Sequence, residues 1–134
     1  MTRKTARENA FILLFEKFIK GDESADEIFT KATEVRELEC DDYVRAVFFG
    51  STEHREMIDA EIEKALVGWR KTRLSNVSLA LLTLSTYELM FMDDIPARVS
   101  INEAIELSKK YDDEKAYSLV NGVLNAVAES LSRK

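Results

Sequence analysis

Residues 95–127, IPARVSINEAIELSKKYDDEKAYSLVNGVLNAV, decide the fold that the sequence predicts. The stretch holds the only proline of the chain, Pro96, which disfavours helix at the residue before it. Ser100, followed three residues later by Glu103, is a capping-box pattern and predicts that a helix opens there. After aspartates at 112 and 113, either of which can start a last helix, apolar residues recur at three-and-four spacing: Ala116, Leu119, Val120, Val123, Leu124, Val127 and Leu131.

The Asn121–Gly122 pair is an ordinary turn signal, but it lies inside this periodic apolar run. A hairpin is therefore not expected there. We interpret Gly122 as a residue that lets a neighbouring helix approach closely, and Asn121 as a hydrogen-bond partner of a nearby backbone group.

Four more helical patterns lie upstream, at residues 5–20, 24–35, 41–68 and 77–92. Ser24 with Glu27 is a capping box for the second, and Ser75 or Asn76 can cap the fourth. Gly50, inside the third, marks either a close packing contact or a bend. The fourth is apolar around most of its circumference, so we expect it near the middle of an all-helical bundle.

The composition agrees with one helical domain spanning residues 1–134. The chain has 46% apolar and 33% charged residues, with only four glycines and one proline. A single cysteine, Cys40, cannot form an internal disulfide, and no charged-then-apolar leader precedes the first helix, so we expect a cytoplasmic protein. The longest uncharged run, residues 74–87, is too short to span a bilayer, which predicts no membrane partner.

The acidic charge is concentrated in one segment. The net charge is −6, but residues 22–42 carry nine acids against Lys31 and Arg36, a local balance of −7, which leaves +1 for the remainder. Because binding of phosphate depends on local positive potential, the acidic total does not exclude an RNA site elsewhere on the surface.

Two short basic clusters are candidates for such a site. Arg3, Lys4 and Arg7 precede any acid in the first helix, although a helix N-terminus favours negative charge. They are either an RNA-contacting edge or a solvated, frayed terminus. The second cluster, WRKTR at Trp69–Arg73, is either a basic contact site or a loop whose tryptophan seals the core edge.

The sequence carries no pattern for catalysis. Metal-ligand spacing, a nucleophile with an adjacent base and a glycine-rich phosphate loop are all missing. The paired aspartates at 41–42, 93–94 and 112–113 sit at expected helix ends, where capping explains them. We therefore expect no catalytic residue, no metal and no cofactor.

Three segments resemble one family. Residues 95–124 are similar to the C-terminal signature of the NusB family of transcription antitermination factors, which runs from a proline through V-A-I-N-E-A-I-E-L-A-K to F-V-N-G-V-L. RKTARENA at 3–10 resembles the arginine-rich opening of the family, and YEL at 87–89 resembles the helix before the signature. The three segments extend over nearly the whole chain.

This resemblance implies a NusB-like bundle of about six to seven helices in two packed subdomains, with halves at about 1–74 and 75–134. It also implies a non-enzymatic factor that binds boxA-type single-stranded nascent RNA together with NusE, a small-subunit ribosomal protein. Such a factor supports transcription of rRNA operons and acts on the elongating RNA polymerase complex indirectly.

The site residues follow from the same resemblance. The RNA-binding set implied by position is Arg3, Lys4, Arg7, Phe15, Tyr111, Lys115 and Leu119. The NusE-binding set is Phe15, Ser78 and Tyr111. Three features depart from the family pattern: Leu119 replaces the commoner phenylalanine, Ser78 and Thr83 stand where an acid and an arginine are common, and Ser100 and Ser108 replace the usual alanines near the signature.

Two other functions stay open at this point. One is a helical protein-interaction module that forms a homodimer and has weak or no RNA binding. The other is the NusB-like domain that is attached to some RNA methyltransferases, although residues 1–134 contain no methyl-donor domain.

Overall fold

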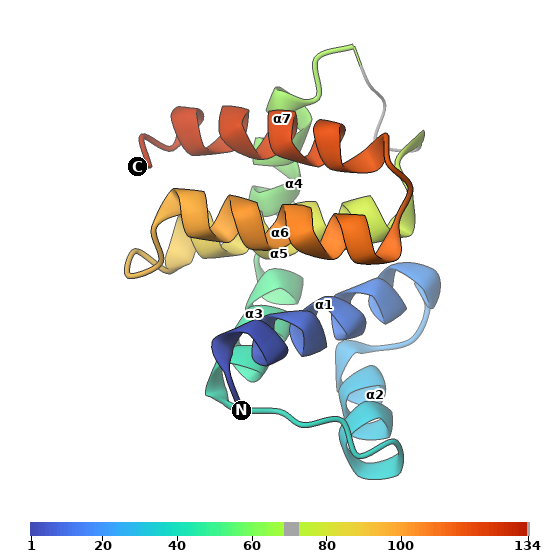
Figure 1. Ribbon diagram of the computed structural model, residues 1–134. Coiled ribbons are helices and arrows are strands. Elements are labelled where there is room, and N and C mark those ends of the chain that lie inside the picture. Colours follow the sequence, from blue (N-terminus) through green and yellow to red (C-terminus); the bar gives the residue numbers. More distant parts are fainter. Residues whose placement is uncertain (69–72, 134) are drawn as a thin grey trace.

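The computed structural model describes residues 1–68 and 73–133, which form seven α-helices and one π-helical turn and contain no strand (Figure 1). In chain order these are α1 (Arg3–Ile19), α2 (Ala25–Thr30), the π-helical turn η1 (Lys31–Val35), α3 (Asp42–Glu53), α4 (Arg55–Ala65), α5 (Asn76–Phe91), α6 (Ala97–Tyr111) and α7 (Ala116–Ser130). The predicted all-helical fold class is confirmed. None of the described helices has the length and apolar character needed to cross a membrane.

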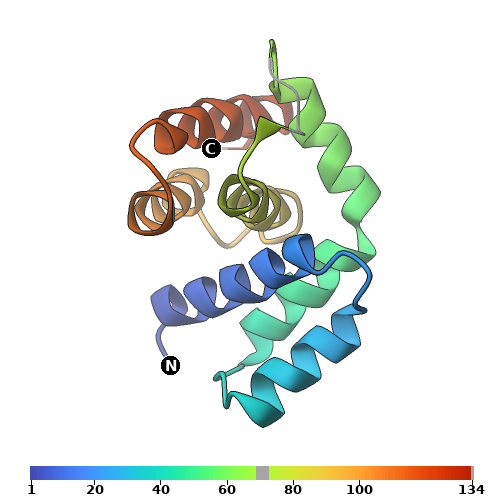
Figure 2. The same ribbon diagram turned by 90° about the vertical axis from the view of Figure 1, so that its right-hand side faces the viewer.

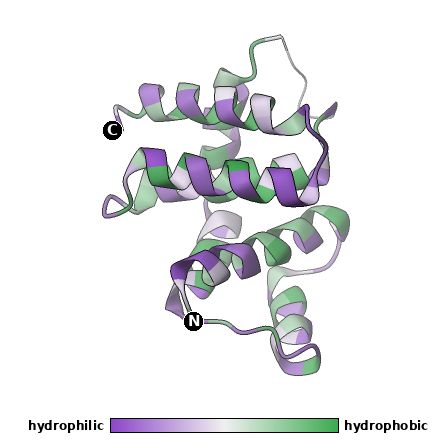
Figure 3. Cartoon of the chain, viewed as in Figure 1, coloured by the Kyte–Doolittle hydropathy of each residue, from purple (hydrophilic) through white to green (hydrophobic). Residues whose placement is uncertain are grey.

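The helices enclose two apolar cores that share α5. The first core lies among α1, α2, α3 and α5, and the second among α4, α5, α6 and α7. Figure 2 looks nearly along α5, with α1 on one side of it and α7 on the other. Figure 3 shows hydrophilic and hydrophobic residues alternating along most helices, as expected when each helix buries one side.

The central position predicted for residues 77–92 is confirmed. Leu81 and Leu84 of α5 are buried in the first core, while Leu82 and Leu89 are buried in the second. The second core also receives Ile58 and Ile62 from α4, which lies within the predicted N-terminal half of the chain. The two cores therefore interlock through α4 and α5.

Several helix starts agree with the sequence. Ser24 accepts a hydrogen bond from the backbone N–H of Glu27 at 3.1 Å, and Ser75 accepts one from that of Ser78 at 3.0 Å. Each bond satisfies one of the N–H groups that a helix leaves unpaired at its beginning. At the last helix, Asp113 Oδ1 accepts from the N–H of Ala116 at 3.0 Å, three residues after the aspartate.

The capping box predicted at Ser100 is wrong. Helix α6 already begins at Ala97, with Pro96 at the position before it. Proline is favoured near a helix start because its fixed φ suits the helix and it has no N–H to satisfy. Ser100 is consequently inside the helix, fully buried, and its hydroxyl donates to Glu88 Oε1 at 2.6 Å.

The long helix predicted over residues 41–68 is two helices. The break falls at His54, where φ is −101° and ψ is 27°. Gly50 does not bend the chain but allows a close contact, because a Cβ there would lie 2.5 Å from the Tyr87 hydroxyl oxygen. One of the two alternatives for Gly50 is thereby selected.

The role predicted for Gly122 is also wrong. Gly122 is exposed, and a Cβ added there would meet nothing within 4 Å. Asn121 is exposed as well, and its Oδ1 accepts a hydrogen bond from Asn125 Nδ2 at 2.7 Å within the same helix. Neither residue mediates close approach of a second helix.

Candidate nucleic-acid interface

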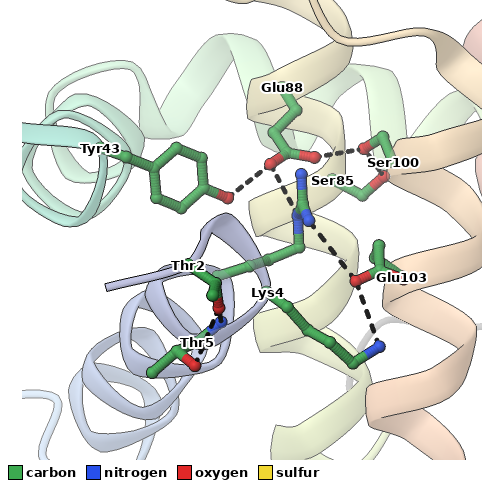
Figure 4. Close-up of polar contacts among 9 residues, drawn as sticks. Thr2, Lys4, Thr5, Tyr43, Ser85, Glu88, Ser100 and Glu103 are labelled. Atoms are coloured by element: carbon green, nitrogen blue, oxygen red, sulfur yellow. Dashed lines mark hydrogen bonds and ion pairs between the residues drawn. The ribbon is translucent and has the colours of Figure 1, made fainter.

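A buried polar cluster joins α1, α3, α5 and α6 (Figure 4). Its centre is Glu88, whose side chain is completely buried. Glu88 Oε2 accepts from Arg7 Nε at 2.9 Å and from the Tyr43 hydroxyl, and Oε1 accepts from the Ser100 hydroxyl at 2.6 Å. Ser85 extends the network with a 2.7 Å bond between its hydroxyl and that of Ser100. These five residues are called the Glu88 cluster below.

Arg7 is therefore an interior residue, with only 3% of its surface exposed. Burial by itself lowers the pKa of its guanidinium, but the negative charge of Glu88 and the Tyr43 hydroxyl outweigh this and raise the pKa above the ordinary arginine value. The Arg7 guanidinium therefore stays charged within the protein. Such burial does not fit the direct contact with RNA that the sequence predicts for Arg7.

Burial also affects the pKa of the Tyr43 hydroxyl. Desolvation, followed by the nearby Glu88 carboxylate, raises the pKa of Tyr43 far above its ordinary value. The hydroxyl therefore remains protonated and donates to Glu88. Because water cannot reach the Glu88 carboxylate, the Tyr43 hydroxyl supplies one of the hydrogen bonds that this buried group needs.

Arg3 and Lys4, the other two members of the basic cluster, are exposed at the beginning of α1. The Arg3 guanidinium lies 4.4 Å from the centroid of the Tyr43 ring. Lys4 Nζ lies 3.5 Å from Glu103 Oε1, which is also 3.6 Å from Arg7 Nη1. With no acid in the first turn of α1, these residues give the helix start a positive surface.

A second group of polar contacts joins α1 to the end of α6. Lys110 Nζ donates to Glu8 Oε2 at 2.7 Å, and the Tyr111 hydroxyl donates to the same oxygen. These two hydrogen bonds lower the pKa of Glu8. Tyr111 is 40% exposed, and its ring lies 5.1 Å from the Phe11 ring, measured between centroids.

Phe15 lies behind this surface. It is half-buried at the edge of the first core, and its ring centroid is 6.0 Å from that of Phe11. Phe11 thus contacts both Phe15 and Tyr111, so the structure brings these two predicted site residues close to one another. Of the two rings, Tyr111 is the more exposed.

The remaining predicted residues line a groove of about 670 Å³ where the ends of α4 and α6 meet the starts of α5 and α7. Lys115 is exposed on its rim and Leu119 is half-buried in its wall. Ser78 is buried, and its hydroxyl donates to Asp112 Oδ2 at 3.3 Å. The exposed candidate residues therefore lie in two adjoining places: along the contact between α1 and α6, and in this groove.

Two residues of this surface, Glu8 and Lys110, were not among the sequence candidates. A lysine near the end of a helix, such as Lys110, is explained in the sequence as a charge that suits the helix dipole, and Glu8 has no visible partner there. The sequence signal that could have identified these residues is the pair of lysines at 109–110, next to the connection between α6 and α7. In the second basic cluster, residues 69–72 lie outside the described part of the chain, while Arg73 is exposed on the groove.

The described residues contain no group of three or more His, Cys, Asp or Glu side chains arranged to hold a metal ion. His54 is half-buried and stacks on Phe91 with 4.6 Å between ring centroids. We interpret His54, which lies at the break between α3 and α4, as a packing residue.

Comparison with known proteins identifies the family. The model of the NusB family matches residues 4–129. The chain belongs to the NusB family. The transcription antitermination protein NusB of Clostridium perfringens (strain SM101) is 41% identical over 135 residues, which covers 98% of this chain and 99% of the relative. The NusB of Bacillus licheniformis is 42% identical over 131 residues, with the same coverage.

Solved NusB structures share the arrangement of helices. T. maritima NusB is 34% identical, with a TM-score of 0.84 over 96% of this chain and 92% of that one. A chain of the crystal structure of antitermination factors NusB and NusE in complex with dsRNA is 33% identical, with a TM-score of 0.84 and 96% of both chains covered. NusB proteins are antitermination factors and not enzymes, so this chain is a non-enzymatic antitermination factor of the NusB family.

Proposed function

We propose that the chain binds a boxA-type single-stranded segment of nascent RNA jointly with NusE in the cytoplasm. In this way it supports transcription of rRNA operons by the elongating polymerase. The observation that carries the proposal is the exposed Arg3–Lys4 pair at a helix start that has no acid in its first turn. Positive side chains at a helix N-terminus, where N–H groups also face outward, favour binding of phosphate.

The exposed aromatic surface supports a single-stranded target. Tyr111 presents part of its ring to solvent, and an unpaired base stacked on such a ring gains roughly 1–3 kcal/mol. Lys115 offers a further charge to the backbone, and Leu119 offers an apolar contact in place of a ring. The related complex with NusE contains double-stranded RNA, so the preference for a single strand rests on Tyr111.

The acidic charge of the chain, which lies mostly in residues 22–42, attracts a basic second protein to the molecule as a whole. The net charge is −6, and complementary charge speeds association and orients the two partners. We place NusE over the groove, with Tyr111 and the edge of Phe15 as its contacts, whereas Ser78 is buried and supports the groove wall through its bond to Asp112. A positive surface of two residues binds RNA weakly by itself, so a composite site with a second protein accounts for useful affinity.

The test is a titration of labelled single-stranded boxA RNA with the protein, in the presence and absence of NusE, at several salt concentrations. We expect NusE to strengthen binding. Replacing Arg3 and Lys4 together by alanine should weaken it and reduce the slope of log affinity against log salt by about 1.4, or about 0.7 for each phosphate that is no longer neutralised.

The matched control replaces Lys20 and Lys31 by alanine. Both are exposed and pair with Glu23, so the variant loses the same charge away from the start of α1; Lys20, at the opposite end of that helix, is about 25 Å from Arg3 along it. Its salt slope should equal that of the wild type. Equal slopes for all three proteins would contradict the proposed RNA edge.

The same protein distinguishes the proposed function from the alternative one. Absence of RNA binding with and without NusE, together with a dimer in analytical sedimentation, would favour the homodimerising interaction module instead.

A further inference from the structure

We propose that Arg7 is a positioning residue for RNA binding, which acts through Glu88 and does not itself contact RNA. In this proposal, which rests on the proposed function, the buried ion pair between α1 and α5 fixes the start of α1. Arg3 and Lys4 are thereby held in the place where they meet the RNA backbone.

The geometry of α1 carries the first step. Arg7 follows Arg3 by four residues and Lys4 by three, so all three side chains lie on one face of the helix. The first two are exposed and the third is buried against Glu88 at 2.9 Å. The anchor is therefore one helical turn below the residues that it positions.

Both exposed residues have a further link to the anchor, and Figure 4 shows the one that joins Lys4 to Arg7 through Glu103. The Tyr43 ring lies under the Arg3 guanidinium at 4.4 Å, while the hydroxyl of the same tyrosine donates to Glu88. Glu103 Oε1 lies 3.5 Å from Lys4 Nζ and 3.6 Å from Arg7 Nη1. The Arg7–Glu88 pair thus orients Tyr43, which contacts Arg3. It also orients Glu103, which contacts Lys4.

The start of α1 needs such an anchor. The first turn of a helix lacks internal partners for its N–H groups and tends to fray, and positive charges there oppose the helix dipole. Thr2 caps one of these groups, the N–H of Thr5 at 3.1 Å, and tertiary contacts add to this cap in holding the turn. A buried ion pair adds little net stability compared with apolar packing, but it fixes position, because either charge left alone in the interior is costly.

Glu88 provides the decisive test, because a completely buried side chain cannot touch RNA. Glu88→Gln should weaken binding of boxA RNA in the presence of NusE by about tenfold, equivalent to about one charge-assisted hydrogen bond to phosphate. In a chain that also carries Arg3→Ala and Lys4→Ala, the same substitution should change affinity by less than about twofold, since nothing remains to be positioned.

If Arg7 contacts RNA directly, Glu88→Gln frees it, and affinity stays equal or rises. That result in a folded variant, or a full effect of Glu88→Gln in the Arg3→Ala/Lys4→Ala background, overturns the proposal. Glu61→Gln is the control, since it removes a half-buried carboxylate on α4 that pairs with Lys64 and accepts from Ser130, and it should leave affinity unchanged.

A milder variant covers the case in which Glu88→Gln does not fold. Tyr43→Phe removes only the hydroxyl that donates to Glu88 and keeps the ring beneath Arg3. It should weaken RNA binding in the same direction, and the effect should likewise disappear when Arg3 and Lys4 are alanine. An unchanged affinity for folded Tyr43→Phe and for folded Glu88→Gln counts against positioning.

Backbone hydrogen exchange separates this inference from the proposed function. In both variants we expect faster exchange of amides within residues 3–9 and unchanged exchange in α7. If the wild type binds no RNA, the proposed function fails, and exchange still reports whether the cluster holds the start of α1. Equal exchange at residues 3–9 in variants and wild type refutes the anchoring step.

Discussion

Replacement of Gly50 by alanine should destabilise the protein, although alanine is the better helix former. The added Cβ would lie 2.5–2.7 Å from the hydroxyl oxygen, Cε2 and Cζ of Tyr87, where ordinary contacts begin at 3.4 Å. The ring is itself in contact with Phe91, at 5.0 Å between centroids, so it cannot move freely. Overpacking of this kind costs about 1–3 kcal/mol, and the gain in helix propensity offsets about 1 kcal/mol.

The net loss is therefore up to about 2 kcal/mol, and each kcal/mol corresponds to about 3–5 °C in Tm for a chain of this length. Gly122→Ala is the matched control. It makes the same substitution inside α7, where the Cβ meets nothing within 4 Å, and it should stabilise by about 0.5–1 kcal/mol. Urea unfolding at one pH gives both values.

The double variant Gly50→Ala/Tyr87→Ala tests the mechanism. Without the ring, Gly50→Ala should no longer cost stability, because the clash is gone while the gain in helix propensity remains. A Gly50→Ala chain as stable as Gly122→Ala refutes the close contact. An equal cost with and without the Tyr87 ring locates the strain elsewhere in α3.

Two further predictions concern α1 and α5. Hydrogen bonds from Lys110 and Tyr111 lower the pKa of Glu8, so this carboxylate contributes stability above the ordinary glutamate pKa of about 4.3, and the contribution is lost as pH falls through the lowered value. Glu8→Gln should therefore show a weaker loss of stability on acidification than the wild type in urea unfolding at pH 7 to 3; parallel curves would contradict this. Ser75→Ala removes the N-cap of α5 and should lower the free energy of unfolding by about 1 kcal/mol, whereas Ser118→Ala, at an exposed site on α7, should stay within about 0.5 kcal/mol. Equal effects of the two serines would argue against the cap.

The helices themselves could be predicted because their signals are local. Apolar spacing identified α5 as the central helix, and the serines at 24 and 75 begin α2 and α5 as their side chains suggest. The break at His54 was not predicted because Gly50 is the stronger helix breaker in that segment. The role of Gly50 depends on Tyr87, 37 positions later in the sequence, and a local pattern does not reveal such a contact.

Arg7 and Ser100 show the limit of local signals most clearly. Each has a residue pattern with a common local meaning, a basic cluster in one case and a capping box in the other. Each instead binds Glu88, which is 81 residues from Arg7 and 12 from Ser100. Because a buried carboxylate requires donors from whichever helices surround it, tertiary packing decides the role of both side chains.

The candidates Arg3, Lys4 and Tyr111 differ from Arg7 and Ser100 because they are exposed. Their exposure agrees with the surface roles implied by the family resemblance, and their contact with RNA stays a prediction. The contacts of Lys4 with Glu103 and of Tyr111 with Glu8 could not be derived from spacing, because both join α1 to α6, about a hundred residues away.

The sharing of α5 between both cores also limits how the chain can be divided. A cut in the connection between α4 and α5 would leave the first fragment without Leu81 and Leu84 to complete its core, and the second without Ile58 and Ile62. Neither piece could bury its apolar surface alone. Two such fragments would instead behave as halves of a complementation pair, ordered only in each other's presence, and their reassembly would restore the Arg7–Glu88 contact across the cut.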